Sequence, residues 1–387
     1  MLPIDINEPT LQEICAQRWS ESSTLDFKRT LPGLSDREKS ELLKDICAFA
    51  NSDGGDIVYG IVEEAGMAKL LAPLTEDRDA TKRRLGQVVD AGLEPRVVGL
   101  HFRDIALSNG GFALVVRVPP SFNGPHRYIV NNVGRFVMRT GTHTTELSYD
   151  QLRTAFDRTA TLAERARRFR EDRIKAIQDR YTWRPIAEGP ICVVHFVPIA
   201  GIAGTRTVDI QYLYNNFTPF IFSGWGGATR STNLDGLAVY GPGDGTLGAY
   251  THIFRNGALE AVRIVGGTHN EQKLVYGTVL DAFLREAIKK FGDQCRQLGF
   301  TGPVVVGIAL LAVPGYVFHP GSAFFLRMSP PQADRPNLVV PEVLLSNIEA
   351  ASQIDEVARP LLDILWQAFG FERCYEYDDQ GKWKSRG

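Results

Sequence analysis

Residues 21–28 read Glu-Ser-Ser-Thr-Leu-Asp-Phe-Lys, and residues 48–61 read Ala-Phe-Ala-Asn-Ser-Asp-Gly-Gly-Asp-Ile-Val-Tyr-Gly-Ile. Apolar and charged side chains alternate in 23–30, which predicts a strand. A Ser-x-x-Glu capping box at Ser35 opens a helix that we expect to reach Ala50. Residues 51–55 predict a turn, and residues 56–62 predict a second strand with an apolar centre. The chain therefore begins with a strand, a helix and a second strand.

Acidic side chains accompany this unit. Successive side chains on a strand point to opposite faces, so Asp26 and Lys28 share a face while Phe27 points to the core. Glu21 lies where the chain enters the first strand. Glu63 follows the second strand and comes close to Asp26 if the two strands are neighbours. Three clustered carboxylates repel one another and favour a bound cation, and oxygen ligands favour Mg²⁺ or Mn²⁺ over zinc.

An acid and a lysine two residues apart on a strand are typical of metal-dependent nucleases. The carboxylates would hold the metal, and Lys28 would orient the attacking water or stabilise the charge that develops on the phosphate. The pattern predicts Glu21, Asp26 and Glu63 as metal ligands, and the same acids with Lys28 as catalytic residues. Glu64 is an alternative third acid. The alternative for the whole cluster is a solvated face on which Asp26 and Lys28 form a surface ion pair.

The rest of the chain predicts an α+β protein of two domains. Periodicity predicts helices over 81–93, 148–180, 271–297 and 353–369. It predicts strands over 97–106, 111–118, 127–131, 134–139, 190–198, 236–241, 249–255, 258–265 and 303–311. We expect a first α/β domain with a mixed sheet over 1–160, a connector helix over 161–180, and a second α+β domain of unknown function over 181–387.

Composition excludes several classes of protein. The 387 residues are 44% apolar and 23% charged, as in soluble globular proteins. No apolar run approaches the ~18 residues of a membrane span, and the first residues do not resemble a signal peptide. Five cysteines without a Cys-x-x-Cys pair argue against a disulfide scaffold and a zinc ribbon. We therefore expect a cytoplasmic protein.

Charge is unevenly distributed along the chain. Residues 1–80 carry 8 Lys/Arg and 16 Asp/Glu, whereas residues 81–175 carry 17 and 9. No acid lies between Asp104 and Glu146 to pair with the arginines of that interval, which are Arg117, Arg127, Arg135 and Arg139. Arginine beside residues such as His126 and Tyr128 suits phosphate contact and stacking on unpaired bases. We predict these four arginines as nucleic-acid-binding residues, with pairing between the acidic and basic segments as the alternative.

Five more arginines lie on the predicted connector helix, where they form either a solvated face or an RNA contact: Arg165, Arg167, Arg168, Arg170 and Arg173.

Other sequence motifs do not have the structural context that their function requires. Gly243, Gly245 and Gly248 match a dinucleotide fingerprint, but residues 249–254 read as a strand where that fingerprint needs a helix. The sequence has no Gly-x-x-x-x-Gly-Lys-Ser/Thr loop, no Gly-x-Ser-x-Gly and no His-Glu-x-x-His.

Residues 21–28 and 48–61, with Val118-Pro-Pro-Ser121 before Pro125 and Arg135-Phe-Val-Met-Arg-Thr-Gly-Thr142, resemble the AlbA-like domain of the Schlafen family. The resemblance covers about residues 10–160. It implies a small α/β fold that binds nucleic acid, and nuclease-active members cut structured RNA with three acids and a divalent metal. By position these acids are Glu21, Asp26 and Glu63. Asp26 stands where the family has Glu, and Glu63 stands where it more often has Asp.

Sequence and resemblance together predict a Mg²⁺- or Mn²⁺-dependent endoribonuclease that acts on structured RNA (tRNA or rRNA) in bacterial defence or stress response. The alternative is a non-catalytic DNA- or RNA-binding regulatory protein. A protein-binding module, with the second domain as a sensor, is a third interpretation. We expect RNA or DNA as partner and no membrane, and we leave open whether the chain forms a homo-oligomer.

Overall fold

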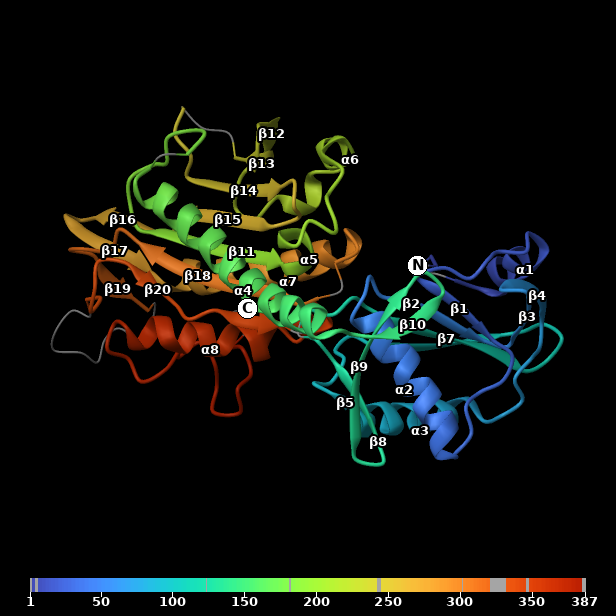
Figure 1. The fold of residues 1–387 in the computed structure, drawn as a ribbon. Helices are drawn as coiled ribbons and strands as arrows, with labels where there is room; N and C mark the ends of the chain where they lie inside the picture. Colours follow the sequence, from blue (N-terminus) through green and yellow to red (C-terminus); the bar gives the residue numbers. More distant parts are fainter. Residues whose placement is uncertain are drawn as a thin grey trace. The chain divides into compact units, whose positions relative to one another are not determined.

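The computed structural model of the chain has an α+β fold (Figure 1), which confirms the predicted class. It describes every residue except 1, 4–5, 123, 181, 242–244, 301, 321–331, 346–347 and 385–387. The chain divides into two compact units, Met1–Thr161 and Leu162–Gly387. One helix, α4 (Tyr149–Gln178), begins in the first unit and ends in the second.

The first unit contains the predicted strand–helix–strand element. Its elements ahead of α4 are α1 (Glu8–Ala16), β1 (Leu25–Lys28), α2 (Asp36–Ala50), β2 (Gly55–Tyr59), β3 (Ile61–Glu64), β4 (Met67–Leu71), α3 (Arg78–Gly92), β5 (Leu93–Glu94), β6 (His101–Ala106), β7 (Phe112–Val118), β8 (Arg127–Val130), β9 (Val133–Thr140) and β10 (His143–Glu146). Parallel neighbours need a crossover connection, and α2 supplies it between β1 and β2. The sheet order is β1-β2-β7-β6, with the other pairs antiparallel, so this sheet is mixed.

α2 begins where its capping box predicts. Ser35 Oγ accepts a hydrogen bond from Glu38 N at 3.3 Å, and the Glu38 carboxylate accepts one from Ser35 N at 3.4 Å. Along the helix, Leu42, Ile46 and Phe49 are buried in the core formed with β2 and β7. This core holds the C-terminal end of α2 beside the strands that carry the candidate site.

The strand predicted over 56–62 is two strands in two sheets. Gly60 has a φ of +97°, which side chains with a Cβ rarely adopt, and the chain turns there from β2 into β3. β3 pairs antiparallel with β4 in a separate two-stranded sheet. Glu63 therefore lies on the β3–β4 hairpin and not on the strand that pairs with β1. A third, antiparallel sheet of order β10-β9-β8-β5 carries Arg127, Arg135 and Arg139.

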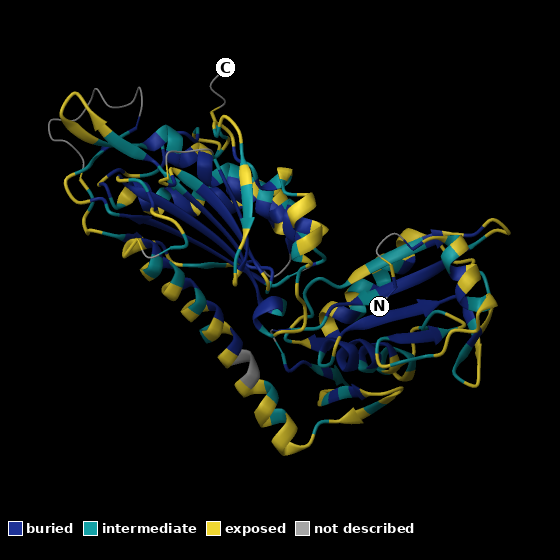
Figure 2. Cartoon of the chain, turned by 90° about the horizontal axis from the view of Figure 1, so that it is seen from above, coloured by how far each residue is buried: buried dark blue, intermediate teal, exposed yellow. Residues whose placement is uncertain are grey.

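The second unit is built on an antiparallel sheet of order β12-β13-β14-β15-β11-β18-β20, with β21 also paired to β18. Its elements are β11 (Ile191–Pro198), α5 (Ile199–Ile202), α6 (Ile210–Asn215), η1 (Thr218–Phe220), β12 (Thr229–Thr232), β13 (Gly236–Tyr240), β14 (Ala249–Phe254), β15 (Leu259–Ile264), β16 (Gly266–His269), β17 (Gln272–Tyr276), α7 (Gly277–Gln297), β18 (Val304–Leu311), β19 (Val317–His319), β20 (Leu338–Val339), β21 (Val343–Leu345), η3 (Ile348–Ser352) and α8 (Ile354–Gln367). Figure 2 shows that the strands at the centre of this sheet are buried.

Helices cover both faces of this sheet. Phe291 of α7 packs against Phe196, with ring centroids 5.6 Å apart. On the other face, Ile174 and Ile177 of α4 pack with Val193 of β11. The helix predicted over 271–297 begins only at 277, because residues 272–276 form β17 instead.

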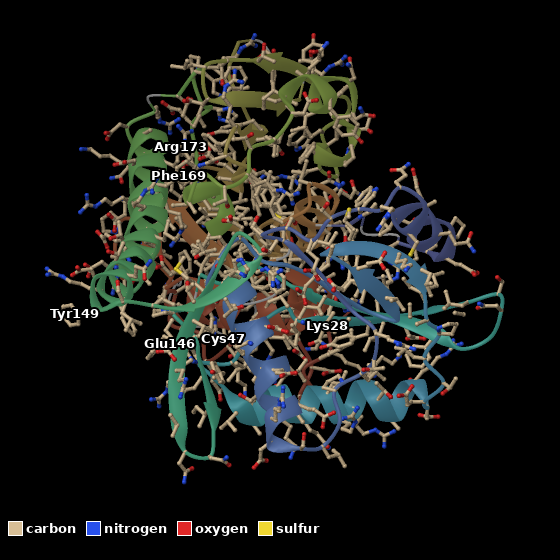
Figure 3. All side chains as sticks on the ribbon, turned by 45° about the vertical axis from the view of Figure 1, so that its right-hand side comes forward. Lys28, Cys47, Glu146, Tyr149, Phe169 and Arg173 are labelled. Atoms are coloured by element: carbon tan, nitrogen blue, oxygen red, sulfur yellow. The ribbon has the colours of Figure 1, made fainter. Side chains whose placement is uncertain are left out.

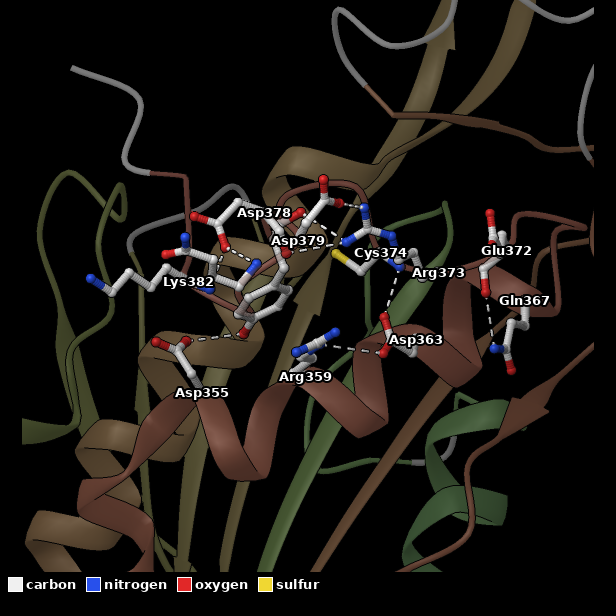
Figure 4. Close-up of polar contacts among 12 residues, drawn as sticks. Asp355, Arg359, Asp363, Gln367, Glu372, Arg373, Cys374, Asp378, Asp379 and Lys382 are labelled. Carbon is white, nitrogen blue, oxygen red and sulfur yellow. Dashed lines mark hydrogen bonds and ion pairs between the residues drawn. The ribbon is translucent and has the colours of Figure 1, made fainter.

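The chain after α8 folds back on that helix (Figure 4). Cys374 N donates to Asp363 Oδ1 at 2.8 Å, and Tyr377 OH donates to Asp355 Oδ1 at 3.1 Å. Elsewhere in the second unit, β14 follows Gly248, which confirms that the glycine pattern there does not open a helix. Gly243 lies outside the described residues. No helix in the described part of the chain has the length and apolar character needed to cross a membrane.

Candidate functional site

Asp26 lies on β1, and the register pairs it with Ile57 of β2, so the two predicted strands are neighbours. Phe27 is 2% exposed and points into the core. Asp26 Oδ2 lies 2.9 Å from Lys28 Nζ, so these two residues share a face, as predicted. The face is not solvated at Asp26, because that side chain is only 8% exposed.

Two cations surround the Asp26 carboxylate. Arg139 Nη2 donates to Asp26 Oδ1 at 3.0 Å, and Lys28 lies at the other oxygen. Lys28 Nζ also lies 3.3 Å from Asp45 Oδ2, a buried carboxylate on α2. Burial alone would lower the pKa of Lys28, but Asp45 and Asp26 outweigh it and raise that pKa above the usual lysine value. Burial raises the pKa of Asp45, and Lys28 offsets part of the rise. Lys28, labelled in Figure 3, is therefore held between two acids.

Glu21 and Glu63 both lie near Gly66. Glu63 Oε2 accepts from Gly66 N at 3.2 Å, and a Cβ on Gly66 would lie 3.9 Å from Glu21 Oε2. Glu21 Oε1 accepts from Phe27 N at 3.0 Å, which fixes this side chain beside β1. Burial raises the pKa of Glu21, and the negative charges of Asp26 and Glu63 raise it further. Two of the predicted acids thus lie near one turn, and Glu21 interacts electrostatically with both Asp26 and Glu63.

Glu64 lies apart from these acids. Its carboxylate pairs with Lys69 Nζ at 2.9 Å and with Arg18 Nη2 at 3.4 Å, and its side chain is 55% exposed. The strand alternation that brings Glu63 to Gly66 sends Glu64 to the opposite face of the β3–β4 hairpin.

The donor chemistry for a divalent cation differs among the predicted ligands. Asp26 is already neutralised by a guanidinium and an ammonium, so it does not fit a metal site in this arrangement. Glu21 and Glu63 are like charges near one turn, and one or two carboxylates are the protein ligands that Mg²⁺ usually takes. Across the described ranges, no group of three or more His, Cys, Asp or Glu side chains is arranged to hold a metal ion.

The premise that no acid pairs with the four predicted arginines is wrong, because Glu146 and acids outside the interval do so. Arg117 Nε donates to the buried Asp56 at 2.7 Å. Arg127 pairs with Glu94 at 2.5 Å, Arg135 pairs with Glu146 at 3.0 Å, and Arg139 pairs with Asp26. Their exposure separates them: the side chains of Arg127 and Arg135 are 43% and 55% exposed, that of Arg117 is 20%, and that of Arg139 is 2%.

The expected aromatic stacking beside these arginines is also wrong, because His126 and Tyr128 are buried. Burial lowers the pKa of His126, whose Nδ1 lies 2.6 Å from Pro95 O. Asn51, which joins α2 to the third sheet, was not among the predicted residues. Its Nδ2 donates to His126 O and Val137 O at 2.8 Å each, and its Oδ1 accepts from His126 N. The sequence feature that could have indicated Asn51 is its place at the end of the Ala-Phe-Ala-Asn run, residues 48–51.

A second buried polar cluster lies in the second unit. Glu260 of β15 is fully buried and accepts from Arg173 Nε and Nη2, His195 Nε2 and Tyr250 OH, all at 2.9 Å. Burial would raise the pKa of Glu260, but Arg173 outweighs it and holds that pKa well below the usual range. Arg173 projects from α4 beside Phe169 (Figure 3). It therefore belongs neither to a solvated helix face nor to an RNA contact.

The match to a protein family concerns the first unit. Residues 21–148 match the family model described as "Schlafen, AlbA_2". No curated protein matches the chain. Among solved structures, the N-terminal domain of a RecG-related protein from Nitrosomonas europaea is 22% identical, with a TM-score of 0.26, covering 33% of this chain and 84% of that one. The DIP2311 protein from Corynebacterium diphtheriae is 15% identical, with a TM-score of 0.25, covering 35% of this chain and 25% of that one. The match to the Schlafen AlbA_2 model therefore lies within the first unit and does not extend to the second.

Proposed function

We propose that the first unit binds RNA or DNA through the β8–β9 hairpin. The observation that carries this proposal is the exposure of Arg127 and Arg135 on adjacent strands of that hairpin. The register pairs Arg127 with Phe136 and Arg135 with Tyr128, so the two arginines leave opposite faces of the hairpin. Each exposed guanidinium can contact a phosphate of a nucleic-acid backbone.

The carboxylates that pair with these arginines do not oppose binding. Glu94 and Glu146 are 58% and 63% exposed, and exposed ion pairs contribute only about 0–1 kcal/mol. A phosphate oxygen can replace each carboxylate and keep the charge-assisted hydrogen bonds. Both arginines are therefore available to a polyanion at low cost.

Binding is best tested by fluorescence anisotropy with labelled tRNA and labelled single-stranded DNA at several salt concentrations. Each lost phosphate contact should flatten the plot of log affinity against log salt by roughly 0.7–0.9. We expect this for Arg127→Ala and again for Arg135→Ala. The control is Arg37→Ala, since Arg37 is 89% exposed on α2 and lies outside the hairpin. An unchanged slope in both hairpin variants would contradict the proposal.

A second candidate function is metal-dependent cleavage of structured RNA, such as tRNA or rRNA. It is favoured by the position of Glu21 and Glu63 near Gly66 and by the raised pKa of Glu21, which burial causes first and the charges of Asp26 and Glu63 increase. In this proposal Glu21 and Glu63 hold Mg²⁺ or Mn²⁺. A bound divalent ion supplies charge neutralisation at phosphate and a more acidic water. Lys28, whose side chain is 39% exposed, lies near enough to the acids to steady an approaching phosphate.

The cleavage test uses tRNA with Mn²⁺ or with a chelator, and calorimetric titration with Mn²⁺ alone. Glu21→Gln and Glu63→Gln should each abolish both cleavage and Mn²⁺ binding. Glu64→Gln is the matched control, because Glu64 is the adjacent acid and pairs with Lys69 instead. Cleavage that survives in the chelator, or in both glutamine variants at the wild-type rate, would exclude this candidate.

A further inference from the structure

The sequence predicts Asp26 as a metal ligand, but in the structure its carboxylate contacts two cationic side chains. Asp26, Lys28, Asp45 and Arg139 form a compact group that we call the Asp26 clamp. It contains two carboxylates and two cations, so its charges balance without a metal. Asp26 and Asp45 are buried to 5% and 7% exposure, which makes their pairing with cations a requirement of burial.

Arg139 connects the clamp to the rest of the unit. Its Nε donates to Ser22 O at 3.2 Å, and its guanidinium carbon lies 4.5 Å from the centroid of the Phe49 ring. Its backbone N donates to Ser52 Oγ at 2.9 Å. A guanidinium stays charged at every accessible pH, so this buried one needs a carboxylate beside it. Asp26 is the carboxylate that its hydrogen bonds reach.

The clamp also joins two sheets. Asp26 belongs to β1 of the mixed sheet, and Arg139 belongs to β9 of the β10-β9-β8-β5 sheet. β9 begins at the exposed end of the β8–β9 hairpin, where Arg135 lies, and Arg139 lies four residues further along it. Holding Arg139 in place therefore fixes the C-terminal end of β9, the strand that carries Arg135.

We propose that Asp26 is a positioning residue and not a metal ligand: it locks β9 against β1 and so holds the hairpin in a fixed orientation for a nucleic-acid phosphate backbone. This inference rests on the proposed binding function of the hairpin. A divalent cation at Asp26 would lie next to the Lys28 ammonium and would leave the buried Arg139 without its carboxylate.

The test compares Asp26→Asn, Arg139→Met and the double variant in the full chain. Asp26→Asn leaves the buried Arg139 guanidinium without a carboxylate, and Arg139→Met leaves Lys28 as the one cation recorded at Asp26. We expect the first unit to melt lower in both variants, by on the order of 10 °C in Asp26→Asn. The double variant removes both charges, so it should lose much less than the sum of the two. Hydrogen exchange should accelerate in peptides from β1 and β9 in each single variant and recover in the double variant.

Two further measurements separate positioning from a general loss of structure. Calorimetric titration with Mn²⁺ should give the same result for Asp26→Asn as for the wild type. The salt dependence of tRNA binding should weaken in Asp26→Asn and return towards the wild-type slope in the double variant. Asp45→Asn is the matched control, since Asp45 contacts Lys28 and should leave exchange in β9 unchanged.

The inference is overturned if Asp26→Asn abolishes Mn²⁺ binding without lowering the melting temperature. It is also overturned if the two single effects simply add. Failure of the proposed binding function is a separate result, seen as no tRNA or DNA binding by the wild-type chain. The coupling between Asp26 and Arg139 in melting and exchange does not depend on nucleic acid.

Discussion

Replacement of Glu260 by Gln should destabilise the second unit strongly. The carboxylate is fully buried and accepts four hydrogen bonds, two of them from Arg173, whose side chain is 17% exposed. An amide keeps the shape but removes the charge, and its NH₂ group would face donors. Breaking a buried ion pair by removing one partner costs about 3–5 kcal/mol, because the remaining charge has no counterion. At 2–4 °C per kcal/mol, the expected fall in melting temperature is roughly 10 °C.

The assay is urea unfolding followed by tryptophan fluorescence. Four of the five tryptophans lie in the second unit, so the signal reports mainly on it: Trp183, Trp225, Trp366 and Trp383. Arg173→Met combined with Glu260→Gln removes both charges and should recover most of the lost stability. Glu164→Gln is the control, because its pairs with Arg167 and Arg168 are exposed and contribute at most about 1 kcal/mol. A loss below about 1 kcal/mol in Glu260→Gln, or no recovery in the double variant, would refute the reasoning.

Other perturbations have equally definite outcomes. Burial lowers the pKa of His252 from 6.5 to about 4, so between these pH values the unfolded chain binds a proton at His252 and the folded chain does not. The free energy of unfolding should therefore fall by about 3 kcal/mol between pH 6.5 and pH 4. Urea titrations of His252→Phe should lack this contribution. Gly307→Ala would press a Cβ against the Arg170 guanidinium and should lower the urea midpoint by an amount equivalent to about 1–3 kcal/mol. Arg117→Met leaves Asp56 buried without its counterion, so thermal unfolding should show a loss of about 3–5 kcal/mol while the salt slope of tRNA binding stays unchanged.

Local features of the first unit were predictable from sequence because their causes are local. The Ser35–Glu38 capping box fixes the start of α2 within one residue. The two-residue period of a strand places Asp26 and Lys28 together and sends Phe27 to the core. The β1–α2–β2 order follows from these signals, and the structure pairs β1 with β2 in parallel.

The partners of the arginines could not be predicted, because they are set by tertiary structure. Asp26 and Arg139 are 113 residues apart in sequence, and Arg117 and Asp56 are 61 apart. An acid-free stretch of sequence therefore says nothing about which acids surround its side chains after folding. For the same reason the role of Asp45 could not be predicted, because its contact with Lys28 forms only when β1 packs beside α2.

The predicted boundaries of strands and helices were wrong where backbone conformation or strand pairing outweighed the apolar pattern. Residues 56–62 read as one strand because their side chains are apolar, but the positive φ of Gly60 ends β2 and starts a strand in another sheet. In the second unit, the amphipathic pattern of α7 extends back into 272–276, yet those residues pair with β16 and β19. Pairing partners decide between helix and strand in such ambiguous runs.

α4 has a practical consequence for dissecting the chain. The boundary between the two units falls within this continuous helix, and its later turns carry Arg173 and Ile174 into the core of the second unit. Cutting the chain after residue 161 would sever intrahelical bonds and leave each fragment with a frayed end. Cloning each half separately is therefore best done with the junction ahead of Tyr149, so that the entire helix travels with the C-terminal fragment.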